Sequence, residues 1–189
     1  MSIEKTQKFE MFGNLLKKWN GSIALTSRAK RDFWGYHQES IDEAQLLSRL
    51  LDKQRPVLDI GSGNGYPGIP LAIDGHAITM VEIKQKKASF LKFVASSLEL
   101  ETEILAENIQ QVNRPFLQIV SKAFASVVKT LDLTHSVRHE ETTFFLLKGE
   151  KFHEELQEAE TQYTFSFKVH PIESNNKVVL ELWNVKDVR

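Results

Sequence analysis

The sequence predicts an α/β protein with a doubly wound, mostly parallel sheet. From residue 55 onward, short apolar runs typical of strands alternate with segments typical of helices. A glycine-rich turn follows the first of these strands, at the position where such sheets bind their ligands. Two further strand-like runs close the chain, which predicts a C-terminal antiparallel hairpin on the sheet.

Length and composition fit an ordinary globular protein. The 189 residues are 41% hydrophobic and 26% charged, and they can bury a core of normal size. We expect a single domain over residues 1–189, with residues 1–54 as an N-terminal helical extension of an α/β core at 55–189. No apolar run approaches the roughly 18 residues of a membrane span, and the N-terminus lacks the apolar segment of a secretory signal. We therefore expect a cytoplasmic protein that does not enter membranes.

The N-terminal extension is expected to contain two helices. The first ends at Asn20-Gly21 and has one apolar face at helical spacing, made by Phe9, Phe12, Leu15, Leu16 and Trp19. The second is expected over Ile41–Leu51. Ser40 would cap its N-terminus and Glu43 would complete a capping box, because a serine followed three residues later by a glutamate is the typical signature.

The core is expected to alternate strands with helices. The expected helices are Gly68–Ile73 and Lys84–Leu98. The expected strands are Val57–Ile60, Ala77–Val81, Glu103–Leu105, Gln118–Val120, Phe144–Leu147, Tyr163–Val169 and Lys177–Val185, with an Asn175-Asn176 turn between the last two.

The glycine-rich turn is compatible with two cofactors. Read from Gly63, it satisfies G-x-G-x-x-G, and Glu82 lies near the spacing expected for a dinucleotide ribose contact. The apolar strand ends at Ile60, however, so the first glycine of the turn should be Gly61. From there an acid-x-Gly-x-Gly-x-Gly pattern fits Asp59, Gly61, Gly63 and Gly65. This register favours a loop around the methionine end of S-adenosylmethionine, with Glu82 on its ribose. A tight turn without any ligand is the third interpretation.

Several short segments along the chain form a recognisable series. They are Lys18-Trp19-Asn20, Leu25-Thr26-Ser27, His37 with Glu39-Ser40-Ile41, the loop GSGNGYPGIP at Gly61–Pro70, Ser121-Lys122-Ala123-Phe124-Ala125-Ser126, and Leu147-Lys148-Gly149. In this order they resemble the RsmG (GidB) family of 16S rRNA guanine-N7 methyltransferases. Each segment alone is weak, and their combination across most of the chain is specific.

The resemblance implies a class I S-adenosylmethionine-dependent methyltransferase fold, Rossmann-like, with residues 55–189 as the cofactor-binding core. It implies 16S rRNA or the small ribosomal subunit as partner. Carried over by position, the family's cofactor contacts fall on Gly61, Tyr66, Ile109, Gln110 and Lys122. The chain departs from the family's pattern at Ala24, Gln110 and Leu117, and at Lys122, which keeps the charge of the family's arginine but not its planar fork.

The chemistry open to this chain is consistent with that resemblance. The sequence has no cysteine, which excludes disulfides, thiolate metal sites and the cysteine nucleophile that methylation of a pyrimidine carbon needs. It also lacks the Asn/Asp-Pro-Pro-aromatic motif typical of exocyclic amine methylation. Guanine N7 carries an in-plane lone pair and needs positioning rather than a general base. We assign no catalytic base, and we expect Lys122, Phe124 and Lys148 to position the acceptor.

Other residues have competing interpretations. Phe124 could stack on the acceptor base, as could Tyr66, or Phe124 could belong to the core. His37 is expected to pack the N-terminal segment onto the sheet at a helix end rather than to act in catalysis. The six histidines show no metal spacing, so we predict no metal.

Basic residues exceed acidic ones before residue 131 and fall short of them after it, which permits binding to RNA phosphates within a net charge of −1. The candidate phosphate contacts are Arg28, Lys30, Arg31, Lys84, Lys86, Lys87 and Lys92, although the last four could equally form a solvated helix face.

Two alternative functions stay open at this point. The chain could be a class I methyltransferase with a protein or small-molecule substrate. It could also be a catalytically degenerate methyltransferase fold that binds RNA or a partner without turnover. We expect a monomer, because nothing in the sequence indicates a larger assembly.

Overall fold

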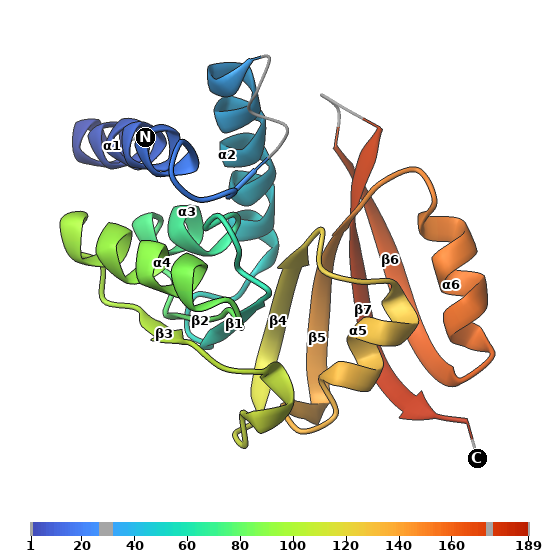
Figure 1. The fold of residues 1–189 in the computed structure, drawn as a ribbon. Helices are drawn as coiled ribbons and strands as arrows, with labels where there is room; N and C mark the ends of the chain where they lie inside the picture. The colour runs from blue at the N-terminus through green and yellow to red at the C-terminus, as the bar shows by residue number, and fades with distance from the viewer. Residues whose placement is uncertain (1, 27–31, 173–175, 189) are drawn as a thin grey trace.

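The computed structural model describes residues 2–26, 32–172 and 176–188, and it shows one central sheet with helices on both faces (Figure 1). The strands are β1 (Val57–Ile60), β2 (Ile78–Val81), β3 (Glu103–Leu105), β4 (Phe116–Lys122), β5 (Arg138–Lys148), β6 (Tyr163–Ile172) and β7 (Lys177–Asp187). The helices are α1 (Ile3–Asn20), α2 (Phe33–Leu50), α3 (Gly68–Ile73), α4 (Gln85–Ser97), α5 (Val127–Leu133) and α6 (Phe152–Glu160), with a 3₁₀ turn at Ile109–Gln111.

The seven strands lie in the order β3-β2-β1-β4-β5-β7-β6. Strands β1 to β5 pair in parallel, whereas β7 pairs antiparallel with both β5 and β6. The predicted mostly parallel sheet with a C-terminal antiparallel hairpin is confirmed. The order reverses between β1 and β4, and the crevice at such a switch point is where open α/β sheets bind ligands.

Alternating side chains divide the core into two layers, because successive strand residues point to opposite faces. In β5, Phe145 and Leu147 pack with α1, α2, α3 and α4, while Phe144 and Leu146 face α5 and α6. The N-terminal helices therefore cover the same face of the sheet as α3 and α4. None of the helices in the described part of the chain has the length and apolar character that a membrane crossing needs.

The predicted bounds are most accurate for the short elements. Strands β1 and β3 and helix α3 have the bounds expected from sequence. Helix α4 is shorter than the expected Lys84–Leu98 by one residue at each end, because Lys84 and Leu98 are its N-cap and C-cap. Strands β4 and β5 extend further than expected. In β5 the added residues before Phe144 are mostly polar and carry no strand-like apolar pattern, and in β4 two apolar residues are added before Gln118 and two polar ones after Val120. The helices α5 and α6 were not predicted; α6 buries only Leu156 and Ala159, too few to make a clear helical pattern.

The predicted start of the second helix is wrong. Helix α2 begins two turns earlier than expected, and the side chain of Asp32 caps it by accepting from the N–H of Gly35 at 2.9 Å. Ser40 and Glu43 lie inside the helix and form no capping box. The first turns carry aromatic residues of modest helix propensity, and packing against α1 stabilises them there, as tertiary contacts often override propensity.

Candidate functional site

The glycine-rich turn has the backbone that the sequence predicted. It leaves β1 at Ile60, and Gly61 and Gly63 adopt positive φ angles of 67° and 52°, which L-residues with a side chain rarely adopt. A Cβ built on Gly61 would also overlap the ring of Phe124. The Phe124 ring therefore fills the space that a side chain at position 61 would need, and Gly61 itself lines the hollows described below.

Two other predicted cofactor residues support the turn from beneath. Asp59 is fully buried, and its Oδ2 accepts from the N–H of Gly68 at 3.2 Å, while Oδ1 has no hydrogen-bond partner among the described residues. Burial raises the pKa of Asp59 to about 7. A Cβ placed on Gly65 would lie 2.9 Å from the side chain of Ile69 and 3.1 Å from the ring of Phe12. Both residues therefore hold the turn onto the elements beneath it, Asp59 through α3 and Gly65 through α3 and α1.

An apolar hollow of about 330 Å³ opens on one side of Gly61. Its lining includes the side chains of Ile83, Ile109, Phe124 and Leu133, and the carboxylate of Glu82 lies at its edge. The two Glu82 oxygens accept from the N–H of Gly63 at 3.0 Å and of Lys84 at 2.8 Å. The hollow thus offers flat apolar walls for a ring system and a fixed carboxylate for hydroxyl groups.

Ile109 and Gln110, the two cofactor contacts that the resemblance implied in the 3₁₀ turn, have different environments in the structure. Ile109 is buried and lines the apolar hollow, whereas Gln110 is exposed and does not. The backbone N–H of Gln110 donates to the side chain of Asn108, which itself lines the hollow.

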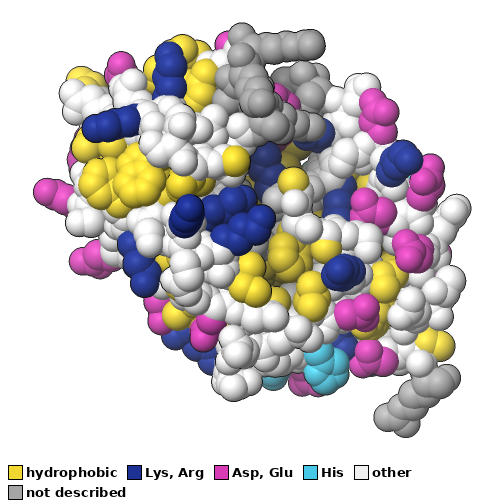
Figure 2. All heavy atoms as spheres, viewed as in Figure 1, with side chains coloured by type: hydrophobic (Ala, Val, Ile, Leu, Met, Phe, Trp, Pro, Cys, Tyr) yellow, Lys and Arg dark blue, Asp and Glu magenta, His cyan; other side chains and the backbone are white. Residues whose placement is uncertain are grey.

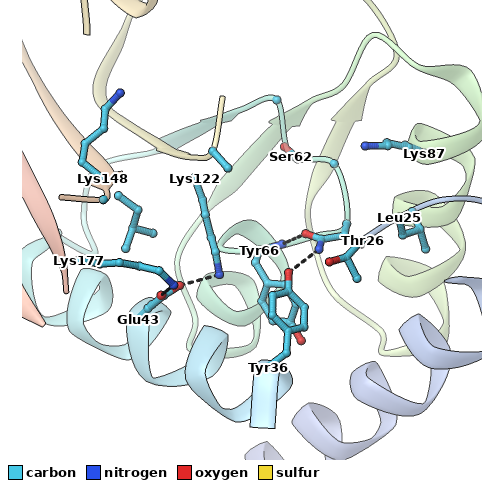
Figure 3. Close-up of a pocket in the computed structure, with 16 residues that line it drawn as sticks. Leu25, Thr26, Tyr36, Glu43, Ser62, Tyr66, Lys87, Lys122, Lys148 and Lys177 are labelled. Atoms are coloured by element: carbon cyan, nitrogen blue, oxygen red, sulfur yellow. Dashed lines mark hydrogen bonds and ion pairs between the residues drawn. The ribbon is translucent and has the colours of Figure 1, made fainter. Parts of the chain in front are cut away.

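A polar hollow of about 440 Å³ lies on the other side of Gly61 (Figure 3). Lys122, at the end of β4, forms an ion pair with Glu43 at 2.6 Å and donates a hydrogen bond to Ser40 at 2.8 Å, both on α2. Its ammonium also lies over the rings of Tyr36 and Tyr66, 5.5 and 5.2 Å from their centroids. Lys122 is therefore held by the N-terminal extension at the wall of this hollow.

Glu43 is the centre of a buried charge network in that wall. Its carboxylate pairs with Lys122 through one oxygen and with Lys177, from the start of β7, through the other at 2.6 Å. Lys177 also pairs with Glu39. Burial alone would lower the pKa of Lys177, but its hydrogen bonds to Glu39 and Glu43 raise it above the usual value.

Lys148 has a different environment from the one expected. Its ammonium donates to the carbonyl of Ala125 at 2.6 Å and to Glu155 at 2.7 Å. Glu155 in turn accepts from the N–H of Val127 at the start of α5. In Figure 3 the side chain of Lys148 points away from Lys122 and Glu43. Lys148 lines the polar hollow, but its ammonium binds the Ala125 carbonyl before α5 and the Glu155 carboxylate on α6, and so links β5 to these two helices.

The tyrosines of the polar hollow connect the extension to the turn. Tyr36 accepts from the side chain of Asn64 at 2.7 Å, and the hydroxyl of Tyr66 hydrogen-bonds His37. His37 lies inside α2 rather than at its end, among the rings of Phe12 and Phe33. Burial lowers the pKa of His37, and its contacts are those of a packing residue.

Sequence reasoning missed several residues of the site. Tyr36, Glu43 and Lys177 line the polar hollow, and Ile83 and Asn108 line the apolar one. Ile83 could have been found, since it directly follows the acid at the end of a strand. The other four carry no local signal, because elements far apart in the sequence bring them together.

Some expectations fall on residues that the structure does not describe. Ser27, Arg28, Lys30, Arg31 and Asn175 lie outside the described ranges. Within those ranges, no three or more His, Asp or Glu side chains come together in a way that could hold a metal ion.

The two hollows together fit an adenosine ligand with a charged amino-acid tail. A ring system can enter the apolar hollow, a ribose can bind at Glu82, and the tail can cross the open backbone at Gly61 into the polar hollow. Concave sites with apolar walls and a few fixed polar groups are typical of cofactor binding. The donor set suits S-adenosylmethionine better than a pyrophosphate, since the turn is followed by the six-residue α3, whose first residue donates to Asp59.

Comparisons with known proteins agree with this geometry. The family described as GidB, rRNA small subunit methyltransferase G, matches residues 5–180. The chain is 30% identical over 188 residues to ribosomal RNA small subunit methyltransferase G of Rickettsia prowazekii, covering 98% of this chain and 97% of that protein. It is 31% identical over 174 residues to the protein of the same name from Gluconobacter oxydans, covering 90% and 89%.

Solved structures with low sequence identity share the fold. Magnesium protoporphyrin IX methyltransferase from Synechocystis, solved with bound SAM, superposes with a TM-score of 0.63 at 11% identity, covering 96% of this chain and 97% of that one. A TehB-like SAM-dependent methyltransferase from Corynebacterium glutamicum superposes with a TM-score of 0.57 at 15% identity, covering 92% and 98%. The expected class I methyltransferase fold is confirmed.

Proposed function

The chain belongs to the family of ribosomal RNA small subunit methyltransferases G, and from that premise we propose that it transfers a methyl group from S-adenosylmethionine to N7 of a guanine in 16S rRNA. The observation that carries the proposal is the pair of hollows that meet at Gly61. One hollow suits an adenosine and the other, beside Lys122, has room for the methionine tail and an acceptor base.

We propose the following roles for the residues of the apolar hollow. Glu82 accepts hydrogen bonds from the ribose hydroxyls, and its own bonds to Gly63 and Lys84 fix the carboxylate in place. Ile83 and Ile109 cover the two faces of the adenine. Gly61 and Gly63 line the polar hollow without a side chain, so the ligand can approach the main chain there.

In the polar hollow, Lys122 binds the carboxylate of the methionine tail, and Tyr66 forms the wall beside it. S-adenosylmethionine supplies an electrophilic methyl group when bound. The chain has to hold the acceptor nitrogen in line with that methyl group at about 3 Å. We assign this positioning to Phe124, whose half-buried ring lies beside Gly61 and lines the apolar hollow. No side chain has to remove a proton, because N7 of guanine carries none.

We also propose that residues 1–189 act as one domain and as a cytoplasmic monomer. In support, α1 and α2 share a single core cluster with β1, and α2 contributes Tyr36 and Glu43 to the polar hollow. A chain without residues 1–54 should therefore lose cofactor binding, as measured by calorimetry.

The test of the function is methyl transfer from labelled S-adenosylmethionine to small subunits and to free 16S rRNA from a strain that lacks this gene. We expect the label on N7 of one guanine. Reduction followed by aniline treatment should then cleave the RNA chain at that nucleotide. Label on another atom, or on protein, would identify a methyltransferase with a different substrate. Cofactor binding without any transfer would identify the degenerate alternative.

A further inference from the structure

The lysines of the polar hollow differ in how their charge is used. Four lysines line it, and three of them have partners: Lys122 and Lys177 pair with Glu43, and Lys148 pairs with Glu155. No hydrogen bond or ion pair joins the ammonium of Lys87 to another of the described residues. Lys87 is thus the one lysine lining this hollow whose ammonium makes no direct ion pair with a described carboxylate.

Lys87 lies at the mouth shared by the two hollows. It lines both of them, and a Cβ placed on Gly63 would lie 3.8 Å from its ammonium. Figure 3 shows its side chain reaching from α4 toward the cavity. Lys84 and Lys86, on the same first turn of α4, are exposed. In Figure 2, lysine and arginine side chains gather over this part of the molecule, beside the opening of the cleft.

An exposed aromatic surface continues from this basic turn along α4. Phe93 is 45% exposed and follows Lys86 by seven residues, so the two lie on nearly the same side of the helix. The ring of Trp19, on α1, lies 5.3 Å from the ring of Phe93 and supports it from behind. Figure 2 shows an apolar patch next to the basic cluster on this face.

We propose that this face of α4 binds the unpaired RNA strand next to the acceptor guanine. This inference rests on the proposed function. Lys87 binds a backbone phosphate at the mouth of the cleft, Lys84 and Lys86 bind neighbouring phosphates, and Phe93 stacks on a base further along. Proteins that bind single-stranded RNA combine a basic track with aromatic side chains in this way. The acceptor base must leave its stack to reach the cleft, so its flanks are single-stranded.

The chain offers matched controls for both residue types on the far edge of the sheet. Phe167 on β6 is exposed to the same 45% as Phe93, and its neighbour Lys168 is also exposed. Strand β6 lies at the opposite edge of the sheet from β3. The substitutions Lys87→Met and Phe93→Ala can therefore be compared with Lys168→Met and Phe167→Ala, after thermal melting has shown all four variants to be folded.

The experiment measures binding to unmethylated small ribosomal subunits and to a labelled single-stranded RNA at several salt concentrations. Phe93→Ala should weaken RNA binding about 10-fold. Lys87→Met should weaken it about 5-fold and reduce the slope of log affinity against log salt by about 1. Neither variant should change the affinity for S-adenosylhomocysteine, and neither control should change RNA binding.

Two results would overturn the inference. Lys87→Met could lower S-adenosylhomocysteine affinity and leave the salt slope unchanged, which would place Lys87 on the cofactor carboxylate. The α4 variants could also bind RNA as well as their controls do, which would place the RNA elsewhere. Both results are independent of turnover. If the wild-type protein binds RNA through α4 but transfers no methyl group to it, the proposed function fails, and only the assignment of α4 as an RNA-binding face is retained.

Discussion

The two hollows share Gly61, Lys87 and Ala123, but they are assembled in different ways. The apolar hollow is built mainly from residues that follow the carboxyl ends of successive parallel strands. The polar hollow draws Tyr36 and Glu43 from α2 and Lys177 from β7, and it depends on buried charge pairs. The first region is therefore a property of short local segments, and the second is a property of the way the N-terminal extension packs on the sheet.

The largest effect is expected at the centre of the polar hollow. Glu43→Gln removes a carboxylate whose side chain is 1% exposed and which pairs with two lysines. Breaking a buried ion pair from one side costs about 3 kcal/mol or more, because the remaining charge loses its partner. Chemical denaturation should show this loss. Glu39→Gln, on the same helix and also paired with Lys177, should cost less than about 1 kcal/mol because Glu39 is more exposed. Equal losses would mean that burial does not set the strength of the network.

The next largest effect is expected at the residue that joins the hollows. Gly61→Ala should destabilise the fold by about 2–3 kcal/mol, because it adds the cost of a positive φ to overlap with Phe124. Gly75→Ala is the control, since Gly75 has a φ of 94° and nothing within 4 Å of its Cβ position. It should cost only about 1–2 kcal/mol. If Gly61→Ala and Gly75→Ala lower the melting temperature equally, the close approach of Phe124 does not contribute to the cost of Gly61→Ala.

A third prediction separates the two hollows by ligand. Glu82→Gln should weaken binding of S-adenosylhomocysteine and of adenosine by about 10-fold each, because hydrogen bonds to a charged acceptor are lost. Lys122→Met should weaken binding of S-adenosylhomocysteine alone, since adenosine lacks the amino-acid tail. Calorimetry and ligand-observed NMR can measure both. A Lys122→Met variant that binds adenosine worse would show that the hollows do not bind independently.

The smallest effect is a difference in pH dependence. Asp59 has its pKa raised to about 7 by burial, so the folded state takes up a proton first as pH falls from 7 to 4, and stability rises. His37 has its pKa lowered by burial, so the unfolded state takes up a proton first below pH 6.5, and stability falls. Each slope is at most about 1.4 kcal/mol per pH unit.

Melting temperatures at pH 7.5 and 5.5 can test these opposite slopes. Asp59→Asn should remove a gain in stability on acidification, and His37→Gln should remove a loss. If Asp59→Asn and His37→Gln change the slope in the same direction, one of the two assignments is wrong.

Sequence patterns predicted the fold and the residues of the apolar hollow more accurately than the surroundings of the polar hollow. The bounds of β1 and α3, the positive φ at Gly61 and the place of Glu82 all follow from local rules, because strand alternation and glycine geometry act over a few residues. The surroundings of Ser40 and Lys148 differ from those expected, because a capping signature and a basic side chain each find other partners once distant elements pack.

By itself, the sequence determined the succession of the seven strands along the chain, the position of the glycine-rich turn and the family to which the chain belongs. Only the tertiary structure decided which charges are available in the cleft. Lys177 and Glu43 are separated by 134 positions, and their contact depends on α2 lying across the start of β7. The sequence alone does not show whether the ammonium of a lysine forms an ion pair, because its partners are the residues that packing brings within a few ångströms.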